Sequence, residues 1–120
     1  MQDAREKDAV LLKHIRECLD RIHEYTGDDP ERFRKSQLVQ DAVVRNLQIM
    51  AESSQRLSDT IKATEPGIPW QDIAGFRNVL THGYLALDTA VVWSVVEGDL
   101  PVLREAVARM ARRNDRDAAE

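Results

Sequence analysis

Three residues with reactive side chains lie close together in the second half of the chain. Residues 77–84 read RNVLTHGY, which brings Arg77, His82 and Tyr84 into one short segment. An imidazole exchanges a proton near neutral pH, and a guanidinium fork stabilises negative charge on phosphoryl oxygens. The segment therefore predicts acid–base chemistry at a centre that becomes negatively charged, with Arg77 and His82 as the candidate catalytic residues.

The spacing of Arg77 and His82 raises a geometric problem. On a continuous helix at about 100° per residue, side chains five positions apart lie roughly 140° apart, so they do not point at one target. Gly83 offers a break in the backbone beside His82, and a two-fold dimer would bring a second copy of both residues to the same groove. Either route predicts a shared cleft.

Two long helices are expected before this segment. Apolar residues recur at steps of three and four over about 5–25 and again over about 36–63, which predicts two helices packed as an antiparallel hairpin. Between them, Asp29 followed by Pro30 is typical of an N-cap and the first residue of a new helical segment.

The second half of the chain predicts three further helices. Residues 64–69 are rich in helix breakers, so a third helix is expected to begin at about Pro69. Asp88 is a plausible N-cap for a fourth helix, which Gly98 and Asp99 would end. A fifth helix would then run to about Met110.

Composition limits the class of protein. With 42% hydrophobic and 32% charged residues among 120, the chain is expected to form one all-α domain over residues 1–120, with a charged tail from about residue 112. Cys18 is the only cysteine, which excludes an intramolecular disulfide and a cysteine-based metal site. The charged N-terminal residues do not resemble a signal peptide, and no run is long enough to span a membrane, so we expect a cytoplasmic protein without membrane contact.

Charge and ligand spacing narrow the candidate sites. The formal net charge of −4 argues against broad electrostatic attraction to nucleic acid, although a local site for one phosphate remains compatible with it. No carboxylate–histidine cluster has the spacing of metal ligands, so neither a metal nor a cofactor is expected. Either of two basic groups could touch an RNA backbone or an acidic partner, but most such charges are merely solvated. The first group is Arg32, Arg34, Lys35 and Arg45, and the later one is Arg104, Arg109, Arg112 and Arg113.

The spacing of Arg77, His82 and Tyr84 resembles the signature of HEPN proteins, in the form typical of the HepT-like toxins. The flanks are similar as well, in the residues at 68–70 and 73–78, in Val92–Trp93 and in residues 42–58. The likeness extends from about residue 9 to residue 110.

The resemblance implies an all-α HEPN-type bundle of about five helices that dimerises about the motif and cleaves RNA without a metal. It also implies a partner, an MntA-like nucleotidyltransferase antitoxin that transfers AMP to the motif tyrosine and silences the toxin. Arg77 and His82 would then be catalytic and Tyr84 the modified residue. Asn78 beside Arg77 could orient the site, although a capping or interhelical hydrogen bond is at least as good an explanation.

RNA suits this chemistry because its own 2′-hydroxyl can attack the adjacent phosphodiester once it is deprotonated, whereas DNA lacks that group. Two other interpretations stay open. Arg77, His82 and Tyr84 could form a purely structural hydrogen-bonded patch, or the chain could be a non-catalytic HEPN module that binds a nucleotide or its partner. The sequence also leaves open whether the RNA is tRNA or mRNA.

Overall fold

The computed structural model describes residues 2–82 and 87–119, so Gly83 and Tyr84 lie outside the described residues. The elements in chain order are α1 (Gln2–Thr26), α2 (Pro30–Lys35), α3 (Gln37–Arg56), α4 (Asp59–Lys62), α5 (Trp70–His82), α6 (Thr89–Ser94), the π-helical segment η2 (Val95–Asp99) and α7 (Leu100–Ala119). The described part of the chain contains no strand, so the predicted all-α class is confirmed.

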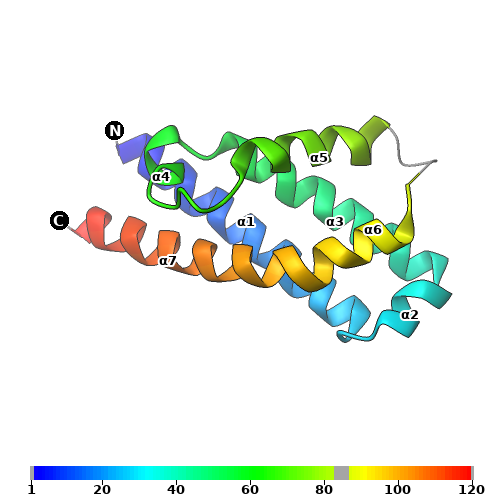
Figure 1. Ribbon diagram of the computed structural model, residues 1–120. Coiled ribbons are helices and arrows are strands. Elements are labelled where there is room, and N and C mark those ends of the chain that lie inside the picture. Colours follow the sequence, from blue (N-terminus) through cyan, green and yellow to red (C-terminus); the bar gives the residue numbers. More distant parts are fainter. Residues whose placement is uncertain (1, 83–86, 120) are drawn as a thin grey trace.

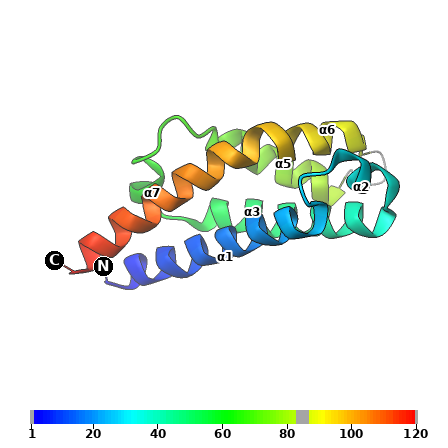
Figure 2. The same cartoon turned by 90° about the horizontal axis from the view of Figure 1, so that it is seen from below.

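Four long elements surround the core. The helices α1 and α3 form the predicted antiparallel hairpin, α5 packs on α3, and α7 packs on α1 (Figures 1 and 2). Ile15, Leu47 and Val107 have no exposed surface and belong to one apolar cluster. Burying such side chains contributes about 1.5–3 kcal/mol each, so this cluster is the main source of stability. Cys18 is buried in the same cluster, as a small apolar residue would be.

Helix caps appear where the sequence predicts them. The Asp29 carboxylate accepts a hydrogen bond from the Glu31 backbone N–H at 2.9 Å, and Pro30 opens α2. The Asp88 carboxylate accepts one from the Ala90 backbone N–H at 2.8 Å. Both caps satisfy backbone donors that have no partner within their helices.

The long helix expected over residues 36–63 is interrupted, so that prediction was wrong in extent. The helix α3 ends at Arg56, and Ser58 begins the short α4. Asp8, buried on α1, accepts hydrogen bonds from the Ser58 backbone N–H at 2.9 Å and from its hydroxyl at 2.7 Å. These two bonds give the Ser58 N–H and hydroxyl a partner on α1, so the chain can leave the helical hydrogen-bond pattern there. The apolar spacing alone does not reveal that partner and therefore predicts too long a helix.

The break expected at Gly98 and Asp99 is also absent. The segment η2 continues α6 directly into α7, and the Leu100 backbone N–H donates to the Val95 carbonyl in the wider π pattern. Pro101 follows at once, and its ring would clash with the preceding turn of a regular α-helix, so a wider turn at this point has a steric reason. Counting α6, η2 and α7 as one run, the described residues form six helices where about five were expected.

The last residues extend this run. The residues from about 112, which were expected to form a charged tail, belong to α7. Asn114 is buried there, and its side-chain amide donates to the Arg5 backbone carbonyl at 3.0 Å. None of the helices in residues 2–82 and 87–119 combines the length and the apolar character that a membrane crossing requires.

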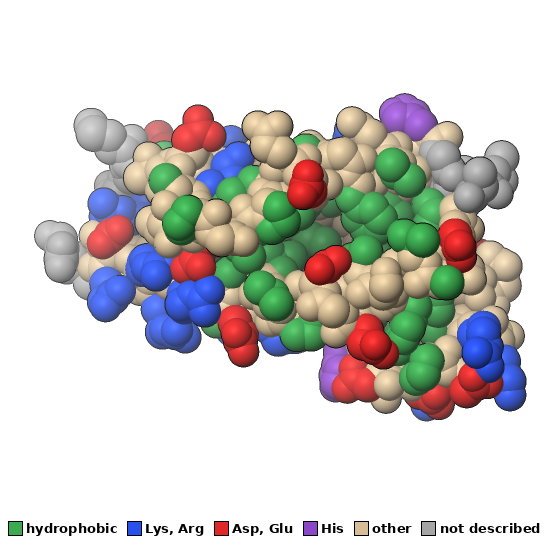
Figure 3. All heavy atoms as spheres, in the orientation of Figure 1, with side chains coloured by type: hydrophobic (Ala, Val, Ile, Leu, Met, Phe, Trp, Pro, Cys, Tyr) green, Lys and Arg blue, Asp and Glu red, His purple; other side chains and the backbone are tan. Residues whose placement is uncertain are grey.

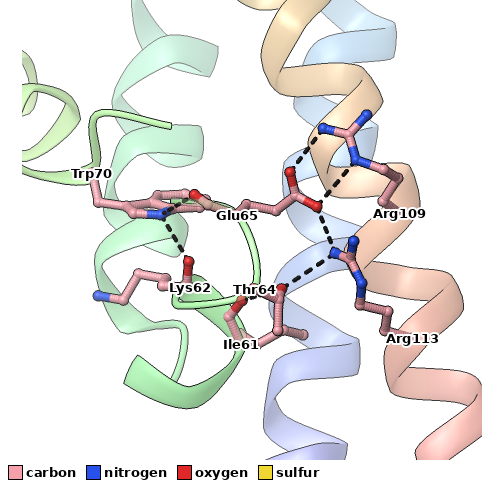
Figure 4. Close-up of polar contacts among 7 residues, drawn as sticks. All are labelled: Ile61, Lys62, Thr64, Glu65, Trp70, Arg109 and Arg113. Atoms are coloured by element: carbon pink, nitrogen blue, oxygen red, sulfur yellow. Dashed lines mark hydrogen bonds and ion pairs between the residues drawn. The ribbon is translucent and has the colours of Figure 1, made fainter. Parts of the chain in front are cut away.

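A buried carboxylate joins the α4–α5 loop to α7 (Figure 4). Arg109 donates to both oxygens of Glu65, at 3.1 and 2.8 Å, and Arg113 donates to one of them. The hydrogen bond from Arg109 is the main cause that lowers the pKa of Glu65 to about 2, and Arg113 adds to it. In the same loop, the Trp70 indole N–H donates to the Lys62 and Glu65 carbonyls at 3.2 and 3.3 Å, which fixes the start of α5.

We predict that the Glu65 contacts make folding sensitive to acid. Since the pKa of Glu65 is about 2 in the folded protein against an ordinary value of 4.5, its ionised form adds stability that is fully present above pH 4.5. That stability is lost as the pH falls toward 2. Urea unfolding of Glu65→Gln should show a lower free energy of unfolding at pH 7 and a weaker decline between pH 4.5 and 2.

The matched control is Glu24→Gln on the exposed surface of α1, which should follow the parent at every pH. Parallel stability curves for the parent and Glu65→Gln across this range would show that the contacts with Arg109 and Arg113 do not have this role.

Candidate functional site

Arg77 and His82 both belong to α5, which is helical through His82. The backbone does not bend between them, so the roughly 140° between their directions persists within one chain. Arg77 is half-buried and His82 is exposed. A break at Gly83 would come after both residues and would leave their relative directions unchanged. One chain therefore does not bring the two side chains to a common point.

Within residues 2–82 and 87–119, the Arg77 guanidinium makes one long hydrogen bond. Its Nη1 donates to the Asn78 side-chain oxygen at 3.4 Å, which is a long contact between exposed groups. The Thr81 hydroxyl donates to the Arg77 backbone carbonyl at 2.9 Å, within the same helix. The structure places Asn78 beside the guanidinium, and an orienting role for it stays a prediction.

The end of α5 that carries His82 is held by a contact from α3. Leu80 is fully buried, and its backbone carbonyl accepts a hydrogen bond from the Gln48 side-chain amide at 2.9 Å. Carbonyls in the last turn of a helix lack partners within the helix, so Gln48 supplies one that the helix cannot. Gln48 was not among the residues expected from the sequence, because no motif links two positions so far apart in the chain.

A hollow with both polar and apolar walls lies next to this contact. It has a volume of about 570 Å³ and is bounded by α2, α3 and the beginning of α6. Gln48, Asp41 and Arg45 line it together with Phe33 and Val92.

The two tryptophans are part of the packing rather than free stacking surfaces. The Trp93 ring lies 5.3 Å from the Phe33 ring, centroid to centroid, and its indole N–H donates to Glu97 at 3.1 Å. Trp70 is half-buried and bound to the loop before α5. Both residues are partly buried and pack against the core.

An apolar groove on another side of α5 does not include the motif. It has a volume of about 480 Å³ and lies between α5 and the η2–α7 run, where Figure 3 shows hydrophobic side chains in a hollow. Ile73, Phe76, Val95 and Leu103 are among its lining residues, and Arg77 and His82 are not. The motif and the groove are therefore separate features of α5.

The described residues contain no group of three or more His, Cys, Asp and Glu side chains placed to hold a metal ion. His23 lies 3.0 Å from the Asp28 carboxylate, and both His23 and His14 are exposed to solvent.

Comparison with known proteins gives a consistent family match. Residues 15–110 match the sequence model of a family described as ribonuclease HepT-like. A Thermococcus cleftensis protein named "Probable ribonuclease HepT" is 35% identical over 94 residues, which is 78% of this chain and 86% of that protein. A Methanocaldococcus jannaschii protein named "Putative RNase" is 31% identical over 99 residues, which is 82% of this chain and 91% of that protein.

One further relative is much longer than this chain. A second M. jannaschii protein, named "Gamma-glutamylcyclotransferase and putative RNase", is 33% identical over 109 residues, which is 90% of this chain. The chain spans about half of that protein, 49% of its length. No solved structure matches the chain.

We predict that Gln48 stabilises the turn that carries His82. Gln48→Leu keeps the approximate size of the side chain and removes the donor to Leu80, at a cost of about 1 kcal/mol. Hydrogen exchange should therefore become roughly fivefold faster in the last turn of α5 and stay unchanged in α1. The control is Gln55→Leu, an exposed position of the same helix α3. Equal exchange at the end of α5 in both variants would count against the role of Gln48.

Proposed function

The chain belongs to the ribonuclease HepT-like family, and on this basis we propose that it is a metal-independent endoribonuclease with Arg77 and His82 as its catalytic residues. The observation that carries the proposal is the family match over residues 15–110, which includes the whole of the Arg77–Tyr84 motif. The matched relatives carry ribonuclease names, which agrees with this activity.

The proposed reaction uses a nucleophile that belongs to the RNA. His82, exposed at the end of α5, accepts the proton of a 2′-hydroxyl, and the 2′-oxygen attacks the adjacent phosphorus. The bond from phosphorus to the 5′-oxygen breaks, and that oxygen takes up a proton from water, while the proton removed from the 2′-hydroxyl is later released from His82 to solvent. The products are a 2′,3′-cyclic phosphate and a 5′-hydroxyl. Arg77 stabilises the negative charge that builds on the phosphoryl oxygens.

A two-fold dimer is the route that remains for combining Arg77 with His82, and the outward face of α5 supports it. A Cβ on Gly75 would meet no other atom within 4 Å, and Val79 is 53% exposed. Gly75 and Val79 are four positions apart, so they lie on one exposed face of α5 that a second helix can approach closely. The apolar faces of α1 and α3 are buried within the chain, so they are not free to form a dimer contact.

Regulation by a partner completes the proposal. An MntA-like nucleotidyltransferase antitoxin would transfer AMP to Tyr84, two positions after His82, in a toxin–antitoxin system of the cytoplasm. The attached phosphate adds negative charge close to Arg77, where it pairs with the guanidinium and repels an incoming RNA backbone. Cleavage would therefore stop without any change in the fold.

A second function has one observation in its favour. Because Arg77 and His82 point in different directions on a single α5, a chain that never dimerised about this helix would be a non-catalytic module that binds a nucleotide or its partner. The oligomeric state and the cleavage of RNA separate the two functions.

We predict a dimer through α5. Light scattering at micromolar concentration should give about twice the chain mass of 13.7 kDa. Val79→Glu places a charge in the proposed contact and should give a monomer that has also lost cleavage. Val10→Glu is the control, since Val10 is equally exposed on α1. A parent protein that is monomeric under these conditions would contradict the shared cleft.

We predict that cleavage of total RNA continues in EDTA and leaves 2′,3′-cyclic phosphate ends. His82→Ala should lower the rate by about 10²-fold or more, because general acid–base catalysis contributes that much. Arg77→Ala should have a comparable effect, and His23→Ala on α1 should have none. Products that end uniformly in a 3′-hydroxyl, or full activity of His82→Ala, would refute the mechanism.

We predict that Tyr84→Phe keeps most of the cleavage activity and escapes silencing, because the ring is retained and the accepting oxygen is lost. After incubation with the partner and ATP, mass spectrometry should show AMP on the parent and none on Tyr84→Phe. Equal modification of both proteins, or full toxicity of a completely modified parent, would contradict the assignment of Tyr84.

A further inference from the structure

Four arginines line a hollow on the last turns of α7. This arginine hollow has a volume of about 430 Å³, and its lining residues are Arg109, Arg112, Arg113, Asp115 and Arg116. The arginines recur at steps of three and four, so they lie along one face of the helix. Lys and Arg side chains gather over this part of α7 in Figure 3, at the opposite end of the bundle from His82 at the end of α5 (Figure 1).

Two of these arginines are held in place by a buried carboxylate. Glu65 is buried and binds Arg109 through two hydrogen bonds and Arg113 through one (Figure 4). The side chains of Arg109 and Arg113 nevertheless remain 42% and 34% exposed. This Glu65 clamp therefore fixes both guanidinium groups and leaves part of each facing solvent.

The other two arginines, Arg112 and Arg116, are exposed. Arg112 and Arg116 form no ion pair within 4.0 Å in the part of the chain that the structure describes. Among the described residues, Asp115 is the only carboxylate on the wall of the hollow, and Glu105 attracts Arg109 from one turn back. Positive charge is thus concentrated here on a chain whose formal net charge is −4.

We infer that the arginine hollow binds phosphate groups of the RNA backbone, an inference that rests on the proposed function. Guanidinium forks match phosphate oxygens with two parallel hydrogen bonds, and holding them in position in advance lowers the entropy lost on binding. Contacts of this kind position an RNA without selecting its bases. The hollow contributes affinity, and Arg77 and His82 carry out the chemistry.

The composition of the wall favours RNA over an acidic protein. Every lining residue is charged, and no apolar side chain from residues 2–82 or 87–119 contributes to the wall. The centre of a protein interface is depleted of charged residues and rich in aromatic and apolar ones. A phosphate backbone needs no apolar contact, because the release of counterions drives its binding.

The test measures RNA binding in the His82→Ala background, where the RNA stays intact. Arg112→Gln combined with Arg116→Gln removes two charges and leaves the Glu65 clamp in place. The control, Lys13→Gln combined with Arg16→Gln, removes the same charge from the exposed surface of α1. Fluorescence anisotropy with a labelled single-stranded RNA between 50 and 200 mM salt gives the affinity and its salt dependence for each variant.

For the arginine pair we expect the slope of log K against log salt to become shallower by about 1.4, or about 0.7 for each phosphate that is no longer neutralised. The affinity should fall roughly tenfold at 0.1 M salt, and the control pair should follow the parent. Arg112→Lys with Arg116→Lys should keep the slope, because the charge is retained. Equal urea midpoints in all variants show that the fold is unchanged.

An arginine pair whose affinity and slope equal those of the control pair would overturn the inference. So would unchanged RNA binding together with lost binding of an acidic protein partner. Cleavage is measured separately with His82 intact. If RNA binding depends on the hollow but the RNA is never cleaved, the proposed endoribonuclease is refuted and the hollow is supported. If the RNA is cleaved but the salt slope of the arginine pair is unchanged, the hollow is refuted and the endoribonuclease is supported.

Discussion

The carboxylate of Glu65 connects two regions of the protein that the chain itself keeps far apart. It binds Arg109 and Arg113 of α7, and the loop that carries it also receives the indole N–H of Trp70 at the start of α5. One buried residue therefore holds both regions, since the Glu65 carboxylate binds the arginines of the hollow and its backbone carbonyl accepts from Trp70 at the beginning of the motif helix. Its low pKa, about 2, follows from the same contacts and keeps it ionised at any pH where the protein works.

The helix α5 carries Arg77 and His82 and has different surroundings on each side. Leu80 anchors it in the core, Gln48 holds its last turn, and the apolar groove lies along one flank. Because the helix is unbroken through His82, residues five positions apart on it, such as Arg77 and His82, lie in different directions. The chain therefore depends on a second copy if both residues are to meet at one phosphate, and the exposed face with Gly75 and Val79 leaves room for that approach.

The two proposed sites lie at different ends of the bundle, whose longest dimension is 49 Å. The motif occupies one end and the arginine hollow the other (Figure 1). An acidic protein can bind RNA in this arrangement because phosphate contacts depend on local clusters of guanidinium groups and not on the net charge of the chain. The apolar groove between α5 and η2–α7 is a third surface, which neither proposal uses.

The sequence by itself determined the features that depend on neighbouring residues. Helix periodicity, the caps at Asp29 and Asp88 and the motif around His82 are local patterns, and they predicted the all-α class, most helix boundaries and the family. Only the tertiary structure decided the interruption at Ser58 and the Glu65 clamp. These depend on partners such as Asp8 and Arg109, which lie far away in the chain, and no local pattern records which distant side chain will satisfy a buried polar group.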